Sequence, residues 1–101
     1  MDQSKGATGT IGDWKAEDDY WRTNYERRPY IGTHRQYETW QPAYRYGWES
    51  WQRYQGKRWE DVEPNLRSGW DTYEHRHDTR STWEQVKDAV RDAWNRVSGN
   101  R

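Results

Sequence analysis

The amino-acid sequence repeats one spacing of aromatic side chains four times, and this spacing constrains the fold more than any other feature. The copies begin 23, 22 and 24 residues apart, at Trp14, Tyr37, Trp59 and Trp83. Counted from that first aromatic as position 0, every copy has a large apolar or aromatic residue at position 7, Arg at position 8 and an aromatic at position 11. Three copies also carry an apolar residue at positions 3 and 14, whereas the first copy has Glu17 and Arg28 there.

Steps of 3, 4, 4 and 3 residues are helical, and at 100° per residue these positions fall within an arc of about 80°. A strand would require alternation, which is absent. The spacing therefore predicts an all-α protein of four helices, each built from one quasi-repeat of about 23 residues. Short links, at residues 29–36, 52–58 and 74–80, favour antiparallel neighbours in a closed bundle. The alternative is an open helical solenoid.

Local signals predict where three of the helices begin and end. Asp13 is expected to cap the first helix, and Arg28 followed by Pro29 is expected to end it. Proline is best tolerated in the first turn of a helix. Pro42 and Pro64 therefore predict that the second helix begins near Thr39 and the third near Asp61. Tyr37 and Trp59 would then belong to the entering segments and fold back onto the helices.

The fourth helix carries a capping box, with Ser81 at the N-cap and Glu84 three residues later. It is expected to run to about Ser98, where Gly99 ends it. Two glycines inside the predicted helices, Gly47 and Gly69, disfavour the helix by about 1 kcal/mol each relative to alanine. A close approach of helices explains them best, and a plain kink is the alternative.

Composition supports one small domain with an aromatic core. Nine Trp and eight Tyr stand against only seven Ile, Leu and Val residues. We expect a flexible N-terminal tail over residues 1–12, a single four-helix domain over 13–98 and a short C-terminal tail over 99–101. A mean hydropathy of -1.72 argues against membrane insertion. The absence of cysteine and of a leader-like start favours a cytoplasmic protein.

The arginine at position 8 is the most regular polar feature of the repeat, and it occurs as Arg22, Arg45, Arg67 and Arg91. It lies beside the aromatic stripe. The favoured interpretation is that each guanidinium lies on neighbouring rings and pairs with a carboxylate four residues away. The sharper alternative is that the four arginines converge on one anionic ligand or partner.

Three tyrosines do not fit the stripe: Tyr20, Tyr30 and Tyr46. Fourteen of the seventeen aromatic rings are placed by the repeat positions or by the segments that enter the helices. Rings that point away from a core are available to a binding partner. These three tyrosines and the four arginines are therefore the candidate binding residues.

Signals for catalysis, cofactors and metals are weak. No catalytic serine motif, phosphate-binding glycine loop or His-Glu-x-x-His pattern occurs in the sequence, so no enzyme activity and no cofactor are predicted. His75, His77 and Asp78, with His34 as a distant fourth group, suggest a metal site. Residues two apart do not share a helix face, however, and a solvated loop is the favoured interpretation.

Nucleic acid is the strongest competing partner, because arginine interleaved with Trp and Tyr is typical of platforms that stack single strands. The chain has 17 basic and 17 acidic residues, so its formal net charge is +0. The two signs also fall in the same segments, and no basic groove is predicted. Nucleic acid is therefore the less favoured partner.

The segment from Tyr37 to Val97 resembles a group of small Tyr- and Trp-rich bacterial proteins. The runs that carry the resemblance are Tyr44–Trp51, Trp59–Arg67 and Ser81–Trp94. Related segments occur beside bacterial stress-response domains, so the resemblance implies a stress-associated, non-catalytic role in a bacterial cytoplasm. It implies no particular binding residues.

The sequence as a whole predicts a non-enzymatic interaction or self-assembly module. Exposed Trp and Tyr faces would bind, and pairs of arginine with carboxylate would fix the register between helices or subunits. A homo-oligomer or filament is the favoured assembly, and another protein is the second choice of partner. Single-stranded nucleic-acid binding is the alternative function.

Overall fold

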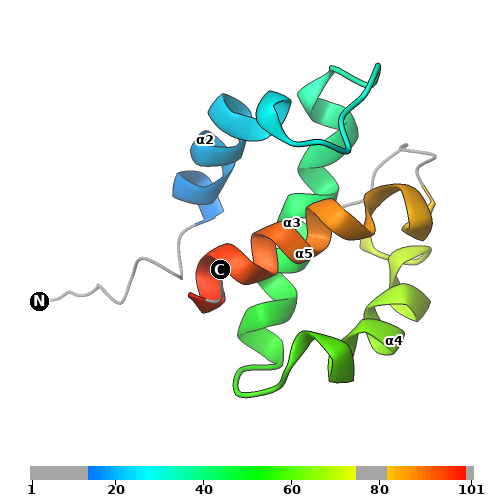
Figure 1. The fold of residues 1–101 in the computed structure, drawn as a ribbon. Helices are drawn as coiled ribbons and strands as arrows, with labels where there is room; N and C mark the ends of the chain where they lie inside the picture. The colour runs from blue at the N-terminus through cyan, green and yellow to red at the C-terminus, as the bar shows by residue number, and fades with distance from the viewer. Residues whose placement is uncertain (1–13, 75–81, 100–101) are drawn as a thin grey trace, which may run out of the picture.

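The computed structural model describes residues 14–74 and 82–99, and within these ranges the protein is all-α (Figure 1). Its elements are α2 (Trp14–Asn24), a short 3₁₀ helix η1 (Tyr25–Arg27), α3 (Tyr37–Arg53), α4 (Trp59–Trp70) and α5 (Trp83–Ser98). The predicted fold class is confirmed. None of the helices in the described ranges is long and apolar enough to cross a membrane.

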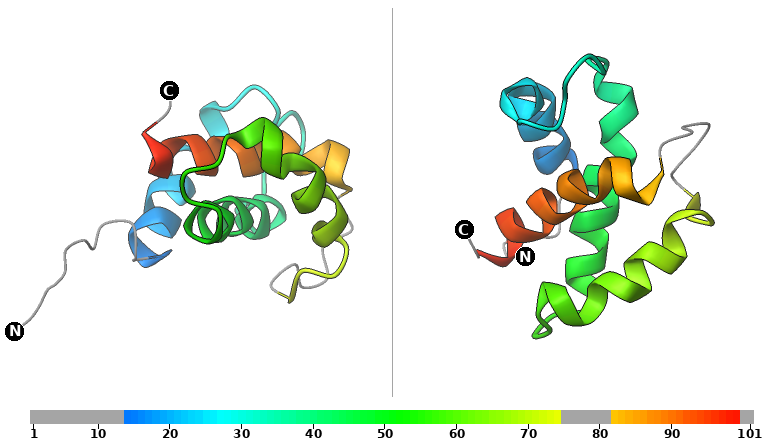
Figure 2. Two further views of the ribbon diagram at one scale, coloured as in Figure 1. Left: turned by 90° about the horizontal axis from the view of Figure 1, so that it is seen from below. Right: turned by 45° about the vertical axis from the view of Figure 1, so that its right-hand side comes forward.

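The centre of the fold is the crossing of α3 and α5, which make the most extensive contact of any two elements. Figures 1 and 2 show α5 lying across α3 at a steep angle, with α2 and α4 on opposite sides of the crossing. Both central helices bury small residues four positions apart: Ala43 and Gly47 on α3, and Ala89 and Ala93 on α5. Small side chains allow two helix axes to approach closely.

Gly47 lies at the tightest point of this crossing. A Cβ atom added there would overlap the carbonyl oxygen of Val90 and would lie 3.0 Å from the Cβ of Ala93. On α4, a Cβ at Gly69 would lie 2.7 Å from the hydroxyl oxygen of Tyr46. Both glycines therefore allow a close approach between elements, which is the preferred prediction over a plain kink.

The core follows the predicted stripe. In α3, α4 and α5 the residues at positions 0, 3, 7 and 11 are all buried, and the largest of those excluded from solvent are Trp40, Trp70, Trp94 and Tyr44. In the first copy, which spans α2 and η1, the same positions hold Trp14, which is partly buried, and the buried residues Glu17, Trp21 and Tyr25. The core is thus largely aromatic. The stripe contains four aliphatic residues, and all four belong to α4 or α5.

Ring contacts between α2 and α3 recur between α4 and α5. Trp14 packs against Trp48 with 5.6 Å between ring centroids, and Trp59 packs against Trp94 at 5.8 Å. Each pair joins position 0 of one copy to position 11 of the next. Guanidinium groups follow the same rule, because that of Arg45 lies 5.7 Å from the Trp14 ring centroid and that of Arg91 lies 5.8 Å from the Trp59 ring centroid.

An antiparallel arrangement of all four consecutive helices is not confirmed. Rings of α2 and α3 do pair in opposite order along the chain: Trp14 with Trp48, Trp21 with Tyr44, and Tyr25 with Tyr37. The main contact, however, joins α3 to α5, which are not consecutive and cross steeply (Figure 2). The helices surround this crossing as a compact domain rather than an open solenoid.

Two predicted helix starts are wrong. Helix α3 begins at Tyr37 rather than Thr39, and α4 begins at Trp59 rather than Asp61. Tyr37 and Trp59 are therefore first-turn residues of the helices, and both rings are buried. Pro42 and Pro64 lie further inside, at the sixth residue of each helix.

Proline is tolerated there for a local reason. Each proline deprives the carbonyl group four residues earlier of a hydrogen bond. Those carbonyl groups belong to Glu38 and Glu60, which are exposed and lie in the first turn, where water can replace the missing donor. Burial of the Tyr37 and Trp59 rings favours these earlier helix starts.

Other helix ends differ by a few residues from the predictions. The N-cap of α5 is Thr82 rather than the predicted Ser81, and the Thr82 side chain accepts a hydrogen bond from the backbone N–H of Gln85 at 3.3 Å. Gly99 ends this helix in the left-handed conformation, with φ 78°, as predicted. Helix α2 ends at Asn24 and continues as η1, so its α-helical part stops before Arg28. Asp13 and Ser81 lie outside the described residues, as do the predicted tail at 1–12 and residues 100–101.

The crossing generates a first prediction. Alanine at a helical glycine normally stabilises a helix, but Gly47→Ala places its methyl group against the Val90 backbone, which cannot move aside as a side chain can. We expect the free energy of unfolding in urea to fall by about 1–3 kcal/mol. Gly69→Ala is the comparison variant: it gains the same helix propensity and meets the bonded Tyr46 hydroxyl rather than a backbone, so we expect a smaller loss than at Gly47. Equal or greater stability of Gly47→Ala would contradict the crossing.

Candidate functional site

The four arginines at position 8 each pair with their own acid. Arg22 pairs with Asp18 at 3.4 Å, Arg45 with Glu49 at 2.9 Å and Arg67 with Glu63 at 3.9 Å, all four residues apart. Arg91 pairs instead across helices, with Glu60 of α4 at 3.9 Å. Three of the four also lie over a ring, since the guanidinium of Arg22 is 4.7 Å from the Tyr37 ring centroid and Arg45 and Arg91 lie over Trp14 and Trp59.

These arginines lie on four different helices, and the contacts of each are made within the chain. Arg22 and Arg45 match the favoured interpretation in full, with a ring contact and a carboxylate four residues away. Arg67 has only the carboxylate and Arg91 only the ring among those contacts. Convergence of the four arginines on one ligand stays a prediction.

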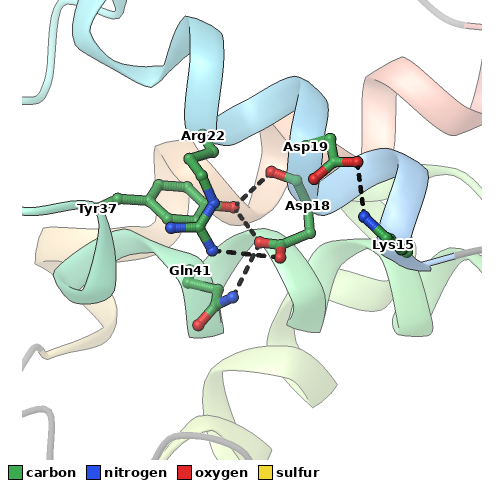
Figure 3. A network of polar contacts seen from close by, with 6 residues as sticks. All are labelled: Lys15, Asp18, Asp19, Arg22, Tyr37 and Gln41. Atoms are coloured by element: carbon green, nitrogen blue, oxygen red, sulfur yellow. Dashed lines mark hydrogen bonds and ion pairs between the residues drawn. The ribbon is translucent and has the colours of Figure 1, made fainter.

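Asp18 shows how such a pair joins two helices (Figure 3). Its carboxylate accepts hydrogen bonds from the Tyr37 hydroxyl at 2.8 Å and the Gln41 amide at 2.9 Å, both on α3, and from Arg22 on its own helix at 3.4 Å. Burial alone would raise the pKa of Asp18, but these hydrogen bonds and the charge of Arg22 outweigh it, so its pKa is lowered. The neighbouring Asp19 pairs only with Lys15 among the residues drawn in Figure 3.

Two of the three tyrosines outside the stripe have partners within the chain. Tyr46 is buried, with 7% of its surface exposed, and its hydroxyl donates to the carbonyl of Leu66 at 2.7 Å. Burial raises the pKa of Tyr46 to about 12. The hydroxyl of Tyr30 donates to Asp92 at 2.7 Å and lies 2.9 Å from that of Tyr44. Both rings join elements of the fold, in contrast to the expectation that they face a partner molecule.

Tyr20 is the third of these tyrosines, and it lies at the surface of α2. It is the one large hydrophobic side chain classed as exposed among the described residues, with 37% of its surface accessible. The guanidinium of Arg96, from α5, lies 3.5 Å from the Tyr20 ring centroid. Arg96 also donates to the buried carboxylate of Glu17 at 2.9 Å. The Tyr20 ring is thus held in place by a cation that is itself anchored across two helices.

Tyr20 stands at the edge of a groove between α2, η1 and α5, of about 750 Å³. We call it the arginine groove, and its lining is formed by Tyr20, Trp21, Asn24, Arg27, Arg28, Asp92, Asn95 and Arg96. Its volume lies within the range of small-ligand pockets. Three guanidinium groups and one carboxylate lie in this lining.

Two of the three arginines in the groove are neutralised by acids of the chain. Arg28 binds Asp92 with two hydrogen bonds, of 2.8 and 3.3 Å, and Arg96 binds Glu17. Arg27 is exposed and has no carboxylate partner within residues 14–74 and 82–99. The groove therefore carries one uncompensated positive charge.

Two residues of the groove lining each carry a buried side-chain atom without a hydrogen-bond partner in the described part of the chain. These atoms are the indole Nε1 of Trp21, a donor, and the side-chain Oδ1 of Asn95, an acceptor. Only 4% of the Trp21 surface is exposed. A buried polar group without a partner costs about 1–3 kcal/mol, so a rearrangement that let a ligand reach either atom would recover free energy. A third such atom, Nε1 of Trp48, lies outside the groove lining.

A second groove, of about 550 Å³, lies between α3 and α4 and is lined in part by Tyr46, Glu49, Tyr54 and Tyr73. Positions 6, 7, 10, 13 and 14 of the first copy line the arginine groove, and the same positions of the third copy line the second groove. The chemistry differs, however, because the Tyr73 hydroxyl donates to Glu49 at 2.7 Å and the lining is rich in tyrosine. The arginine groove is the one that combines an uncompensated charge with buried atoms that lack partners.

Several residues of the arginine groove were not predicted as binding residues from the sequence, namely Trp21, Arg27, Arg28, Asn95 and Arg96. The first copy of the repeat does contain a pattern that indicates this groove. That copy departs from the apolar pattern at position 3 and position 14, where it has Glu17 and Arg28. Both pair with α5, Glu17 with Arg96 and Arg28 with Asp92. The departures from the repeat mark the edges of the groove.

Most of the polar groups in the groove are hydrogen-bond donors. They include three guanidinium groups and an indole N–H. The single carboxylate of the groove, Asp92, is held by Arg28 and Tyr30. Within the described residues no group of three His, Cys, Asp or Glu side chains could hold a metal ion. His75, His77 and Asp78 lie outside those residues.

Comparison with known proteins gives no match: no protein-family model, no curated protein and no solved structure is similar to this chain at a significant level.

The Asp18 network generates a second prediction. A carboxyl group whose pKa is lowered on folding contributes stability that is present above its unfolded-state pKa and is lost as the pH falls through the folded value. Because the pKa of Asp18 is lowered from 3.8, Asp18→Asn should reduce the free energy of unfolding by about 1–3 kcal/mol at pH 7. The difference from the natural protein should shrink as the pH falls below about 4. Urea unfolding at several pH values measures this.

Asp19→Asn is the matched control for Asp18→Asn, because it removes the same charge one residue away from an exposed pair with Lys15. We expect its effect at pH 7 to be much smaller. Equal effects of the two substitutions, or a loss for Asp18→Asn that does not change with pH, would contradict the role of the network.

Proposed function

We propose that the protein is a non-catalytic interaction domain that binds its partner in the arginine groove. The observation that carries this proposal is the combination found there: an arginine without an acid, and a buried donor and acceptor without partners, beside the exposed ring of Tyr20. Aromatic and arginine side chains are enriched among the residues that dominate binding energies. The groove offers both.

The fold prepares this surface for binding. Arg96 is anchored by Glu17 and covers the Tyr20 ring, and Arg28 is anchored by Asp92. These cross-helix pairs fix side chains that would otherwise lose rotational freedom when a partner binds. Ordering before binding reduces the entropy cost of association.

The proposal narrows the surface expected from the sequence. Exposed Trp and Tyr faces were expected to bind, but most of these rings are in the core, and Tyr20 is the most exposed of the large rings in the described part of the chain. Stacking of nucleic-acid bases needs accessible ring faces, so burial of the rings also counts against the single-strand alternative. A stress-associated, cytoplasmic role and self-association remain predictions.

Site-specific photo-crosslinking in the native cells tests the proposal. A photoreactive phenylalanine analogue in place of Tyr20 should give a discrete adduct. The same analogue at Gln55, an exposed residue between α3 and α4, should not give that adduct. A second substitution, Arg27→Glu, should abolish it. Failure to form an adduct at Tyr20, or an adduct that Arg27→Glu leaves unchanged, would reject the groove as the binding surface.

Self-association is tested separately by sedimentation equilibrium of the purified protein. If a second copy occupies the arginine groove, the average mass should rise above the chain mass of 12.5 kDa as the concentration increases. Arg27→Glu should return it to that of the single chain. A constant mass of one chain at all concentrations would exclude the homo-oligomer or filament and leave a different protein as the partner.

A further inference from the structure

We propose that the ligand of the arginine groove is an acidic peptide segment. Its side-chain carboxylate would bind Arg27, and a backbone amide of the same segment would bind Trp21 and Asn95. This inference rests on the proposed function, because it names the chemistry of the partner at the same groove.

One positive charge in the groove is free to bind a further anion. Arg28 and Arg96 already have carboxylates within hydrogen-bond distance, from Asp92 at 2.8 Å and Glu17 at 2.9 Å. Arg27 presents its guanidinium in the same lining without such a partner. Guanidinium groups bind carboxylates through paired, charge-assisted hydrogen bonds, so a single Glu or Asp side chain completes the charge balance.

The two buried atoms without partners specify the rest of the ligand. The indole Nε1 of Trp21 can only donate, and Oδ1 of Asn95 can only accept. A peptide group supplies the complement of both, because its carbonyl accepts and its N–H donates. A sulfate or carboxylate ion offers acceptors only and would leave Oδ1 of Asn95 unsatisfied. The pair of atoms therefore favours a polypeptide over a simple anion.

Tyr20 and Arg96 form the wall beside these polar groups. The ring is exposed, and its orientation is fixed by the guanidinium 3.5 Å from its centroid. A flat aromatic surface of this kind packs against the methylene groups of a glutamate side chain or against the peptide backbone. Glutamate reaches further than aspartate, so a glutamate-containing segment fits best.

The test is NMR of the full chain titrated with a capped peptide that contains two adjacent glutamates. The reporter is the indole N–H signal of Trp21, assigned by its loss in Trp21→Phe. We expect this signal to move downfield on titration as its hydrogen bond forms. The matching diglutamine peptide should bind about tenfold or more weakly, because it lacks the charge that pairs with Arg27.

Arg27→Gln should weaken binding of the diglutamate peptide by about tenfold or more. Arg58→Gln is the matched control, because Arg58 is also exposed, at the start of α4, and its loss changes the net charge equally. Equal effects of the two variants would mean that binding depends only on the net charge of the protein, which would overturn the inference.

Inorganic phosphate forms the third arm of the experiment. If phosphate shifts the Trp21 signal as strongly as the diglutamate peptide, the groove is a simple anion site and the peptide inference fails. If no probe moves the Trp21 signal while the Arg27-dependent adduct at position 20 still forms in cells, the acidic ligand is rejected and the interaction function remains. Loss of both results would reject the groove itself.

Discussion

The close crossing of α3 and α5 is the contact on which the rest of this structure depends. It is permitted by small residues at positions 6 and 10 of the second and fourth copies, where α3 has Ala43 and Gly47 and α5 has Ala89 and Ala93. The same positions of the first copy hold Tyr20 and Asn24, which are too large for such an approach. Copies with the same aromatic spacing therefore take different places in the fold. The second and fourth copies form the crossing of α3 and α5, and the first and third copies form α2 and α4 on either side of it.

The outer position of α2 explains why a binding surface arises where it does. At the crossing, α5 packs on α3, and its polar side faces α2 and η1 across the arginine groove. The ion pairs of Glu17 with Arg96 and of Arg28 with Asp92 span this gap, in place of the apolar contacts that the other copies make at those positions. Packing of α3 against α5 thus leaves the polar arginine groove at the edge of the crossing. Arg27 is the arginine of this groove that has no carboxylate partner in the described part of the chain.

The sequence predicted the parts of this fold that depend on periodicity. The aromatic stripe, its burial and the close approach at Gly47 follow from spacing and from the cost of glycine in a helix. Periodicity does not say which helices pack together, so the dominance of α3 and α5 was missed. Tyr46 and Tyr30 lie off the stripe of their own segments but bond to Leu66 and Asp92 from other elements. The groove was missed because it joins segments far apart in the chain, although Glu17 and Arg28 signalled it.

The most direct test of this account is a set of nuclear Overhauser contacts in the natural protein at the crossing. The structure places Gly47 against Val90 and Ala93. Cross-peaks between the Hα protons of Gly47 and the methyl group of Ala93 are therefore predicted. Their absence, together with contacts of Gly47 only to neighbouring segments of the chain, would contradict the crossing and with it the origin of the groove.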